Sequence, residues 1–175
     1  MRAVVVYESM YGSTHKVADA IRAGLQGAFE VTVVPLGEAT AAVLADAGLV
    51  VVGGPTHVHG MSRAGTRKTA AQTAAKRASG VQLEPGADAP GLREWFGSLG
   101  RYHVRAAAFD TRMQGPAALT GRASTRVARL LRDHGFTMAA KPESFLVTRQ
   151  EELAEGETGR AREWAAKLAG AVAPV

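Results

Sequence analysis

The sequence contains no cysteine among its 175 residues. This absence excludes disulfide bonds, thiolate zinc sites, iron–sulfur clusters and a cysteine nucleophile. There is no asparagine either, so the chain has no acceptor for N-glycosylation. No apolar run approaches the roughly 20 residues that a membrane-spanning helix needs, and the N-terminus lacks the apolar core and cleavage site of a signal peptide. We therefore expect a cytoplasmic protein with no membrane span.

Aromatic residues are also scarce, at 6% of the chain, yet hydrophobic residues reach 46% and charged residues 21%. These values are typical of a globular protein, and 175 residues suffice to bury a full core. No internal repeat or low-complexity linker interrupts the chain, so we expect one domain over residues 1–175. The net charge of +5 favours anionic partners and decides nothing about the fold.

Apolar, β-branched runs alternate with segments of helical periodicity along the whole chain. This alternation predicts an α/β protein in which helices cover both faces of a parallel sheet. Strands are expected at residues 2–7, 30–35, 48–53, 104–109 and 136–148, the last interrupted near Pro142. Helices are expected at residues 14–26, 39–45, 64–78, 92–99, 124–134 (with Ser124 as N-cap) and 157–171. Loops are expected at residues 55–62, 81–90 and 110–120.

The turn between the first strand and the first helix carries the clearest functional signal. Ser9, Ser13 and Thr14 supply three hydroxyls around Gly12, and no acidic side chain lies within residues 9–14. Free amides and the positive dipole end at a helix N-terminus favour a phosphate there. The alternative is an N-cap cluster without a ligand. The chain has neither the lysine of a GxxxxGK[ST] loop nor a GxGxxG motif, which disfavours ATP, GTP and Rossmann-type dinucleotides.

Residues 4–14, Val-Val-Val-Tyr-Glu-Ser-Met-Tyr-Gly-Ser-Thr, resemble the first strand and phosphate loop of the flavodoxins. That family's pattern is an apolar strand followed by [ST]-x-[TY]-G-x-T, and residues 49–56 add a buried strand that runs into Gly-Gly-Pro-Thr. The resemblance implies a three-layer sandwich with a five-stranded parallel sheet of order 2-1-3-4-5. It also implies that FMN binds noncovalently beside the point where the strand order reverses.

By the same resemblance, the loop after the third long strand covers one face of the flavin ring. Flavodoxins that carry single electrons often have Trp followed by Gly there, whereas His57 and Val58 stand at these positions. Gly60 follows two residues later and is an alternative flexible position. His57 and His59 form an HxH pair, but no third ligand lies nearby in the sequence, so we expect no metal site.

The loop after the fourth strand would contact the ring from the other side. Flavodoxins frequently have Tyr in this loop, and here Arg112 or Met113 could pack against the ring instead. Arg112 lies either beside the flavin or in water, and Asp110 either binds the flavin or caps a helix or turn. No nucleophile–base set is recognisable, so no catalytic residue is predicted. The complete set of predicted cofactor-binding residues is Ser9, Met10, Tyr11, Gly12, Ser13, Thr14, Pro55, Thr56, His57, Val58, His59, Gly60, Asp110, Thr111, Arg112 and Gly115.

The resemblance implies an FMN-binding redox protein but leaves its role open. As an electron carrier it would serve a redox partner protein. As an enzyme it would resemble the flavodoxin-like quinone reductases or protoporphyrinogen oxidases and reduce or oxidise a small acceptor such as an anionic quinone. A flavin-free structural or regulatory relative is the third possibility. We expect a monomer or weak dimer, and no nucleic-acid partner, because no known motif is present.

Two stretches of the chain carry basic residues and no acid. Residues 48–83 and 111–132 contain five Lys or Arg each. Both stretches begin at loops expected beside the flavin, so we expect an electropositive rim and an anionic partner or substrate. The candidates are Arg63, Arg67, Arg122 and Arg126. The alternative is that these side chains form solvated helix faces.

Overall fold

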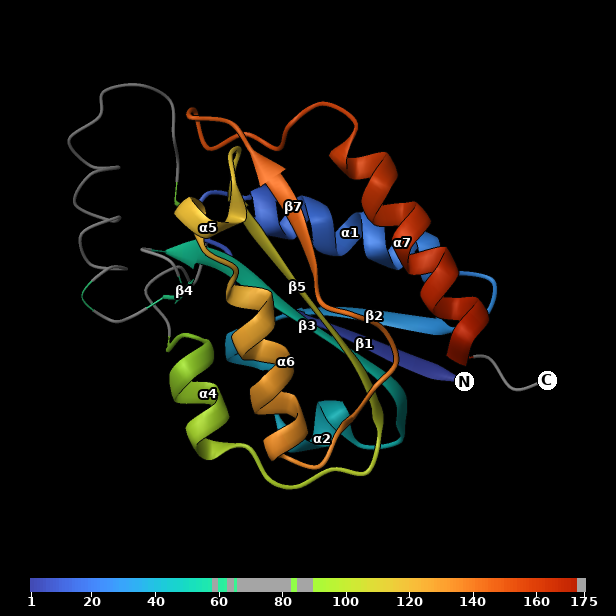
Figure 1. Ribbon diagram of the computed structural model, residues 1–175. Helices are drawn as coiled ribbons and strands as arrows, with labels where there is room; N and C mark the ends of the chain where they lie inside the picture. The colour runs from blue at the N-terminus through green and yellow to red at the C-terminus, as the bar shows by residue number, and fades with distance from the viewer. Residues whose placement is uncertain (58–59, 63–64, 66–82, 85–89, 173–175) are drawn as a thin grey trace.

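The computed structural model describes residues 1–57, 60–62, 65, 83–84 and 90–172, and shows a parallel sheet between two layers of helices (Figure 1). Its central strands are β1 (Arg2–Tyr7), β2 (Glu30–Pro35), β3 (Ala47–His57) and β5 (Arg105–Met113), in the order β2-β1-β3-β5. The short strands β6 (Thr137–Met138) and β7 (Glu143–Val147) both pair in parallel with β5. The predicted order 2-1-3-4-5 is therefore confirmed, with the fifth strand divided around Pro142.

Helices bury both faces of the sheet, as the continuous apolar strands require. One face packs against α1 (Ser13–Leu25) and α7 (Glu157–Val172). The other packs against α2 (Ala41–Leu44), which follows a 3-10 turn at Leu36–Glu38, and against α4 (Leu92–Ser98) and α6 (Ala123–Asp133).

Neighbouring residues of β1 contribute to opposite cores. Val4 and Val6 pack on the α4 and α6 side, while Val5 packs on the α1 and α7 side, and all three are fully buried. The contact between α1 and α7 is close enough to require a glycine, because a Cβ at Gly24 would lie 2.2 Å from the carbonyl oxygen of Arg162. Two well-packed layers therefore hold the strand ends in fixed positions.

The third long strand extends beyond its predicted end. β3 continues to His57 and turns back into β4 (Gly60–Met61), so that Thr56 pairs with Met61 and His57 with Gly60. The prediction of a loop over residues 55–62 is wrong at the paired positions. Pairing with a neighbouring segment outweighs the weak strand propensity of the Gly-Gly-Pro sequence.

The fourth long strand extends in the same direction. β5 continues to Met113 because its last residues pair with β7, from Phe109 opposite Glu143 to Met113 opposite Val147. A short helix, α5 (Ala117–Thr120), follows. The prediction of a loop over residues 110–120 is therefore wrong at both ends of that range.

The start of α6 is capped by side chains from the sheet. The backbone N–H of Ala123 donates to Thr56 Oγ1 at 3.0 Å, and that of Ser124 donates to Asp110 Oδ2 at 2.7 Å. Ser124 lies inside the helix, so its prediction as the N-cap is wrong. The ends of β3 and β5 are thereby fastened to α6. No helix in the described part of the chain is long and apolar enough to span a membrane.

Candidate functional site

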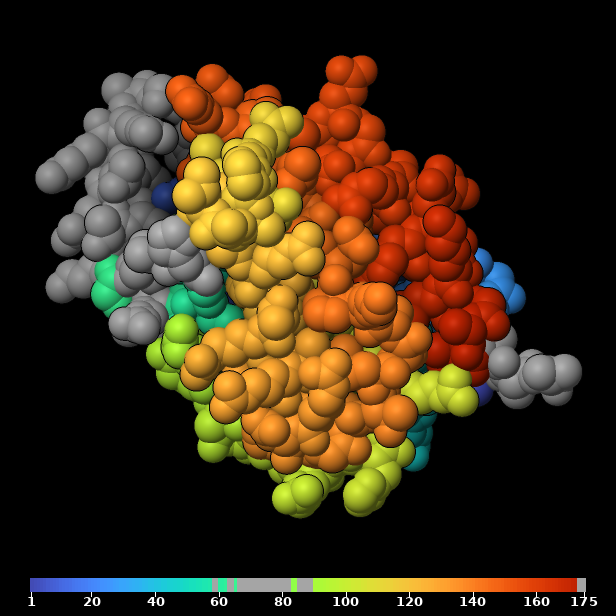
Figure 2. All heavy atoms as spheres, viewed as in Figure 1, coloured from blue at the N-terminus to red at the C-terminus, as the bar shows by residue number. Residues whose placement is uncertain are grey.

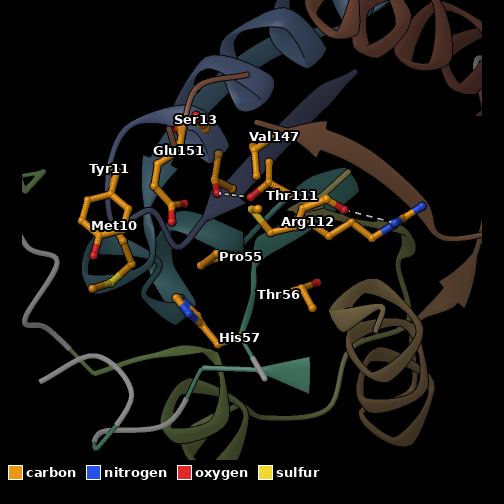
Figure 3. Close-up of a pocket in the computed structure, with 12 residues that line it drawn as sticks. Met10, Tyr11, Ser13, Pro55, Thr56, His57, Thr111, Arg112, Val147 and Glu151 are labelled. Carbon is orange, nitrogen blue, oxygen red and sulfur yellow. Dashed lines mark hydrogen bonds between the residues drawn. The ribbon is translucent and has the colours of Figure 1, made fainter. Parts of the chain in front are cut away.

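A pocket of about 230 Å³ lies at the carboxyl ends of β1, β3 and β5 (Figure 3). The position is the one that ligands of open parallel sheets occupy, beside the reversal of strand order between β1 and β3. The pocket is lined by Met10, Tyr11, Ser13, Thr14, Pro55, Thr56, His57, Thr111, Arg112, Met113, Val147 and Glu151.

The first turn of α1 presents backbone donors at one end of this pocket. Gly12 is the N-cap and has a left-handed backbone, with φ of 93°. Its own N–H donates to Ser9 Oγ at 3.1 Å, and no side chain caps the N–H groups of Ser13, Thr14 and His15. The first turn also contains no acidic residue. This donor set is suited to a phosphate, because the dipole and the uncapped amides act in the same direction.

The hydroxyls predicted to bind phosphate are not equally available. Ser9 Oγ accepts a hydrogen bond and keeps its own proton to donate. Thr14 and Thr111 join their hydroxyls at 2.8 Å, which uses one of their two protons and leaves the other. Ser13 donates its proton to the carbonyl oxygen of Glu151 at 2.6 Å. The Ser9 hydroxyl and the Thr14–Thr111 pair are therefore the side chains that still have a proton to donate to a ligand.

The far end of the pocket is suited to an aromatic ligand. Pro55 and the two thioethers of Met10 and Met113 provide polarisable apolar walls. His57 supplies a ring at this end, whereas Figure 3 shows the ring of Tyr11 at the edge of the pocket nearer to Ser13 and Glu151. The pocket therefore joins an anion-binding end to an apolar end.

Arg112 does not direct its charge into the pocket. Its Nη1 donates to the Gly115 carbonyl oxygen at 2.8 Å and to Thr120 Oγ1 at 2.9 Å. Figure 3 shows the side chain pointing away from the other labelled residues. Arg112 is one of the lining residues, and its guanidinium holds the connection between β5 and α5. Its position beside the flavin stays a prediction.

Asp110 is fully buried behind the pocket and is not part of its lining. Burial raises the pKa of its carboxyl group, although the hydrogen bond from the Ser124 N–H acts in the opposite direction. Of its two predicted roles, the structure shows the helix cap. Asp110 is followed in β5 by Thr111, whose side-chain hydroxyl contacts that of Thr14.

The connection between β7 and α7 is anchored by a charged network. Glu157 Oε2 accepts from the Leu146 N–H at 2.7 Å, and Arg160 bonds both Glu157 and Glu143 at 2.6 Å. Burial opposes ionisation of Glu157, but the hydrogen bonds from Arg160 and Leu146 outweigh it and lower the pKa of Glu157. This network fixes the base of the turn that carries Glu151.

Two residues of the lining, Val147 and Glu151, were not predicted, and Met113 was considered only as an alternative to Arg112 for packing on the ring. Met113 and Val147 face each other across β5 and β7, and knowing the true length of β5 would have identified them. Glu151 has a left-handed backbone, with φ of 64°, and Figure 3 shows its carboxylate directed into the pocket. No local signal in the sequence marks it, because its contact with Ser13 joins residues 138 positions apart.

The structure brings together nine of the sixteen predicted binding residues. Ser9, Gly12, Gly60, Asp110 and Gly115 are described but do not line the pocket, whereas Val58 and His59 lie outside the described residues. The predicted rim residues Arg63 and Arg67 also lie outside them, as does the helix predicted over residues 64–78 except for position 65. Within the described ranges, no group of three or more His, Asp or Glu side chains is arranged to hold a metal ion.

Comparisons with known proteins agree with this arrangement. The flavodoxin family model matches residues 5–93, just over half of the chain. No curated protein sequence matches it significantly. Among solved structures, it is similar to a flavodoxin from the domain Archaea, with 20% identity over 98% of this chain and 99% of that one and a TM-score of 0.65. Flavodoxin 1 from Bacillus cereus has 15% identity over 97% and 98%, with a TM-score of 0.65.

The fold also occurs as part of a larger protein. It is similar to a segment of rubredoxin oxygen:oxidoreductase from Desulfovibrio gigas, with 20% identity over 98% of this chain and 36% of that one and a TM-score of 0.60. At these identities the solved structures establish the fold, and the family match identifies the lineage. The chain belongs to the flavodoxin family.

Proposed function

We propose that this protein binds FMN in the pocket at the end of β1, β3 and β5 and transfers electrons between redox partners. One observation carries the proposal: a single pocket joins the uncapped N-terminus of α1 to an apolar end that contains the His57 ring. FMN combines a phosphate with an aromatic ring system and therefore matches both ends. When bound, it would supply the oxidation–reduction chemistry that the side chains lack.

The phosphate would lie on the N–H groups of Ser13, Thr14 and His15. Hydroxyl donors would come from Ser9 and from the Thr14–Thr111 pair. Backbone donors held by a packed helix need no reorganisation when the anion arrives, and hydroxyls add donors without adding charge. The chain would thus fix one end of the cofactor and thereby its position along the sheet edge.

The ring would lie between the end of β3 and the end of β5. Pro55, Met10 and Met113 would exclude water from it, and His57 would present an imidazole at its edge. An imidazole can hold or release a proton near neutral pH. The role of the predicted residues Val58, His59 and Gly60 at this end stays a prediction.

The second candidate function is an FMN-dependent oxidoreductase that acts on a small acceptor such as a quinone. His57 stands where carriers of single electrons often have a large stacking ring, which leaves room for a second ligand. The flavin-free alternative has support from Glu151, whose carboxylate would face an incoming phosphate. Direct measurement of flavin binding separates this last alternative from the other two.

The test is titration of the purified protein with FMN and with riboflavin, followed by flavin fluorescence and the visible absorption spectrum. We expect one FMN per chain and clearly weaker binding of riboflavin, because riboflavin lacks the phosphate. Equal affinity for the two flavins, or binding of neither, would contradict the proposal. Rapid mixing of the reduced protein with a quinone or a protein acceptor then separates an enzyme from a carrier.

A further inference from the structure

The surface of α6 carries a stripe of arginines. Arg122, Arg126 and Arg129 are spaced by four and three residues, so they project from the same side of the helix, and all three are exposed. Arg132 extends the stripe and is also exposed. The first acid after residue 111 is Asp133, whose carboxylate lies 3.9 Å from Arg129 with both side chains largely in solvent. A pair of this kind neutralises little of the field.

An exposed apolar side chain lies beside this stripe in the sequence and in the fold. Leu119, on α5, is 70% exposed, the highest value for a large hydrophobic residue in the described part of the chain. The Arg112 guanidinium holds this connection through Gly115 and Thr120, so the leucine is presented on an anchored segment. Figure 2 shows α5 and α6, in yellow and orange, as one continuous surface.

One end of the stripe adjoins the pocket. The N–H of Ala123 donates to Thr56 Oγ1 at 3.0 Å, and Thr56 lines the pocket. Arg122 and Arg126 are therefore close to the cofactor end, while Arg132 lies about 15 Å further along the helix axis, at 1.5 Å per residue. A molecule bound along the stripe would have one edge at the proposed flavin.

We propose that α5 and α6 form the docking surface for an acidic redox protein, with Leu119 as the apolar contact and the arginine stripe as the charged rim. This inference rests on the proposed function, since the exchange of electrons between the flavin and its partner is part of that proposal. An exposed apolar residue next to arginines is typical of protein interfaces. Residues 117–133 contain no aromatic side chain for stacking on nucleic-acid bases, which favours a protein over a single-stranded nucleic acid.

The test measures binding of a strongly acidic plant-type [2Fe–2S] ferredoxin, used as the probe, by calorimetry at low and high salt. The test variant is Arg122→Glu/Arg126→Glu. The matched control is Arg162→Glu/Lys167→Glu, two exposed residues of α7 on the opposite layer. Each variant changes the net charge by 4, from +5 to +1, so bulk charge is equal in the two.

We expect the α6 variant to weaken probe binding about tenfold at low salt and to reduce its salt dependence, because attraction between exposed charges is screened within about 8–10 Å. The α7 control should change it less than twofold, and Leu119→Ser should weaken it about threefold without changing the salt dependence. Equal weakening by both charge variants, or no probe binding by the wild type, would overturn the proposal. So would tighter binding of a short DNA duplex through the same arginines.

The readout separates this inference from the proposed function. Probe binding does not require electron transfer, and FMN affinity is measured on the same variants. If the wild-type protein does not bind FMN, the proposed cofactor is refuted, but the probe-binding measurements still test the docking surface. Normal FMN binding with probe affinity unaffected by the α6 variant would refute the docking surface alone.

Discussion

The hydroxyl of Thr14 provides the sharpest test of how the pocket recognises its ligand. Thr14 is 2% exposed, and its Oγ1 lies 2.8 Å from that of Thr111, which is 4% exposed. Thr14→Val keeps the shape of the side chain and removes this hydroxyl. We expect two separate effects, one on the fold and one on the ligand.

For the fold, the substitution leaves the Thr111 hydroxyl buried without its partner. An unsatisfied buried hydroxyl costs about 1–3 kcal/mol, so the free energy of unfolding should fall by that amount. The double variant Thr14→Val/Thr111→Val removes both partners and should recover part of the loss. For the ligand, a hydrogen bond to a charged group contributes about 1.5–3 kcal/mol, so FMN should bind roughly 10- to 100-fold more weakly.

Fluorescence titration with FMN and riboflavin measures the ligand effect. Riboflavin affinity should change less than about twofold, because the lost donor faces the phosphate position. Thr111→Val is the matched control, since it breaks the same hydrogen bond but leaves a hydroxyl on α1. It should weaken FMN binding less than Thr14→Val does. Equal loss of affinity for both flavins would refute the assignment of this turn to the phosphate.

Three further predictions use other groups of the fold and pocket. Because burial raises the pKa of Asp110, the contribution of this group to stability is complete below its unfolded pKa and is lost as pH rises through its folded pKa. Asp110→Asn keeps an acceptor for the Ser124 N–H, so in denaturant titrations it should show a larger free energy of unfolding at pH 7 and a flatter dependence on pH. A smaller free energy of unfolding at pH 7 would contradict this prediction. Burial, followed by nearby negative charge, raises the pKa of Tyr7 to about 12, so an absorbance titration at alkaline pH should show one of the three tyrosines ionising late. The stability that this group contributes should persist to pH 10 and decline toward pH 12. Three tyrosines titrating together near pH 10 would disprove the burial argument. Glu151→Gln removes a carboxylate that faces the proposed phosphate and should strengthen FMN binding roughly threefold with little effect on riboflavin, whereas weaker FMN binding would show that this carboxylate supports the site.

The sequence was sufficient to predict the central strands because buried parallel strands leave a clear apolar signal, whereas the order of the strands was implied by the resemblance to the flavodoxins. The valine-rich runs of β1, β2 and β3 and the turn at Gly12 are local features, set by side-chain shape and backbone freedom. Even the interruption of the fifth strand near Pro142 was predictable, since proline cannot donate to a sheet ladder. The alternation of strands and helices follows from such local signals, whereas the strand order and the position of the pocket were implied by the resemblance.

The errors arose where distant segments supply the partner. Residues 110–113 resemble a turn in isolation but extend β5, because β7 pairs with them. The cap of α6 comes from Asp110, 14 positions before Ser124, and from Thr56, 67 positions before Ala123. A hydrogen bond between residues so far apart leaves no periodicity in the sequence. The same reason explains why Glu151 was missed, because its contact with Ser13 joins residues 138 positions apart.

The most direct test of the central claim is a titration of ¹⁵N-labelled protein with FMN, followed by amide chemical shifts. The account predicts saturation at one equivalent, with the largest shifts at Gly12, Ser13, Thr14 and His15, and much smaller shifts at these four amides when riboflavin is added instead. Shifts confined to other parts of the chain, or equal shifts at these amides with both flavins, would contradict it.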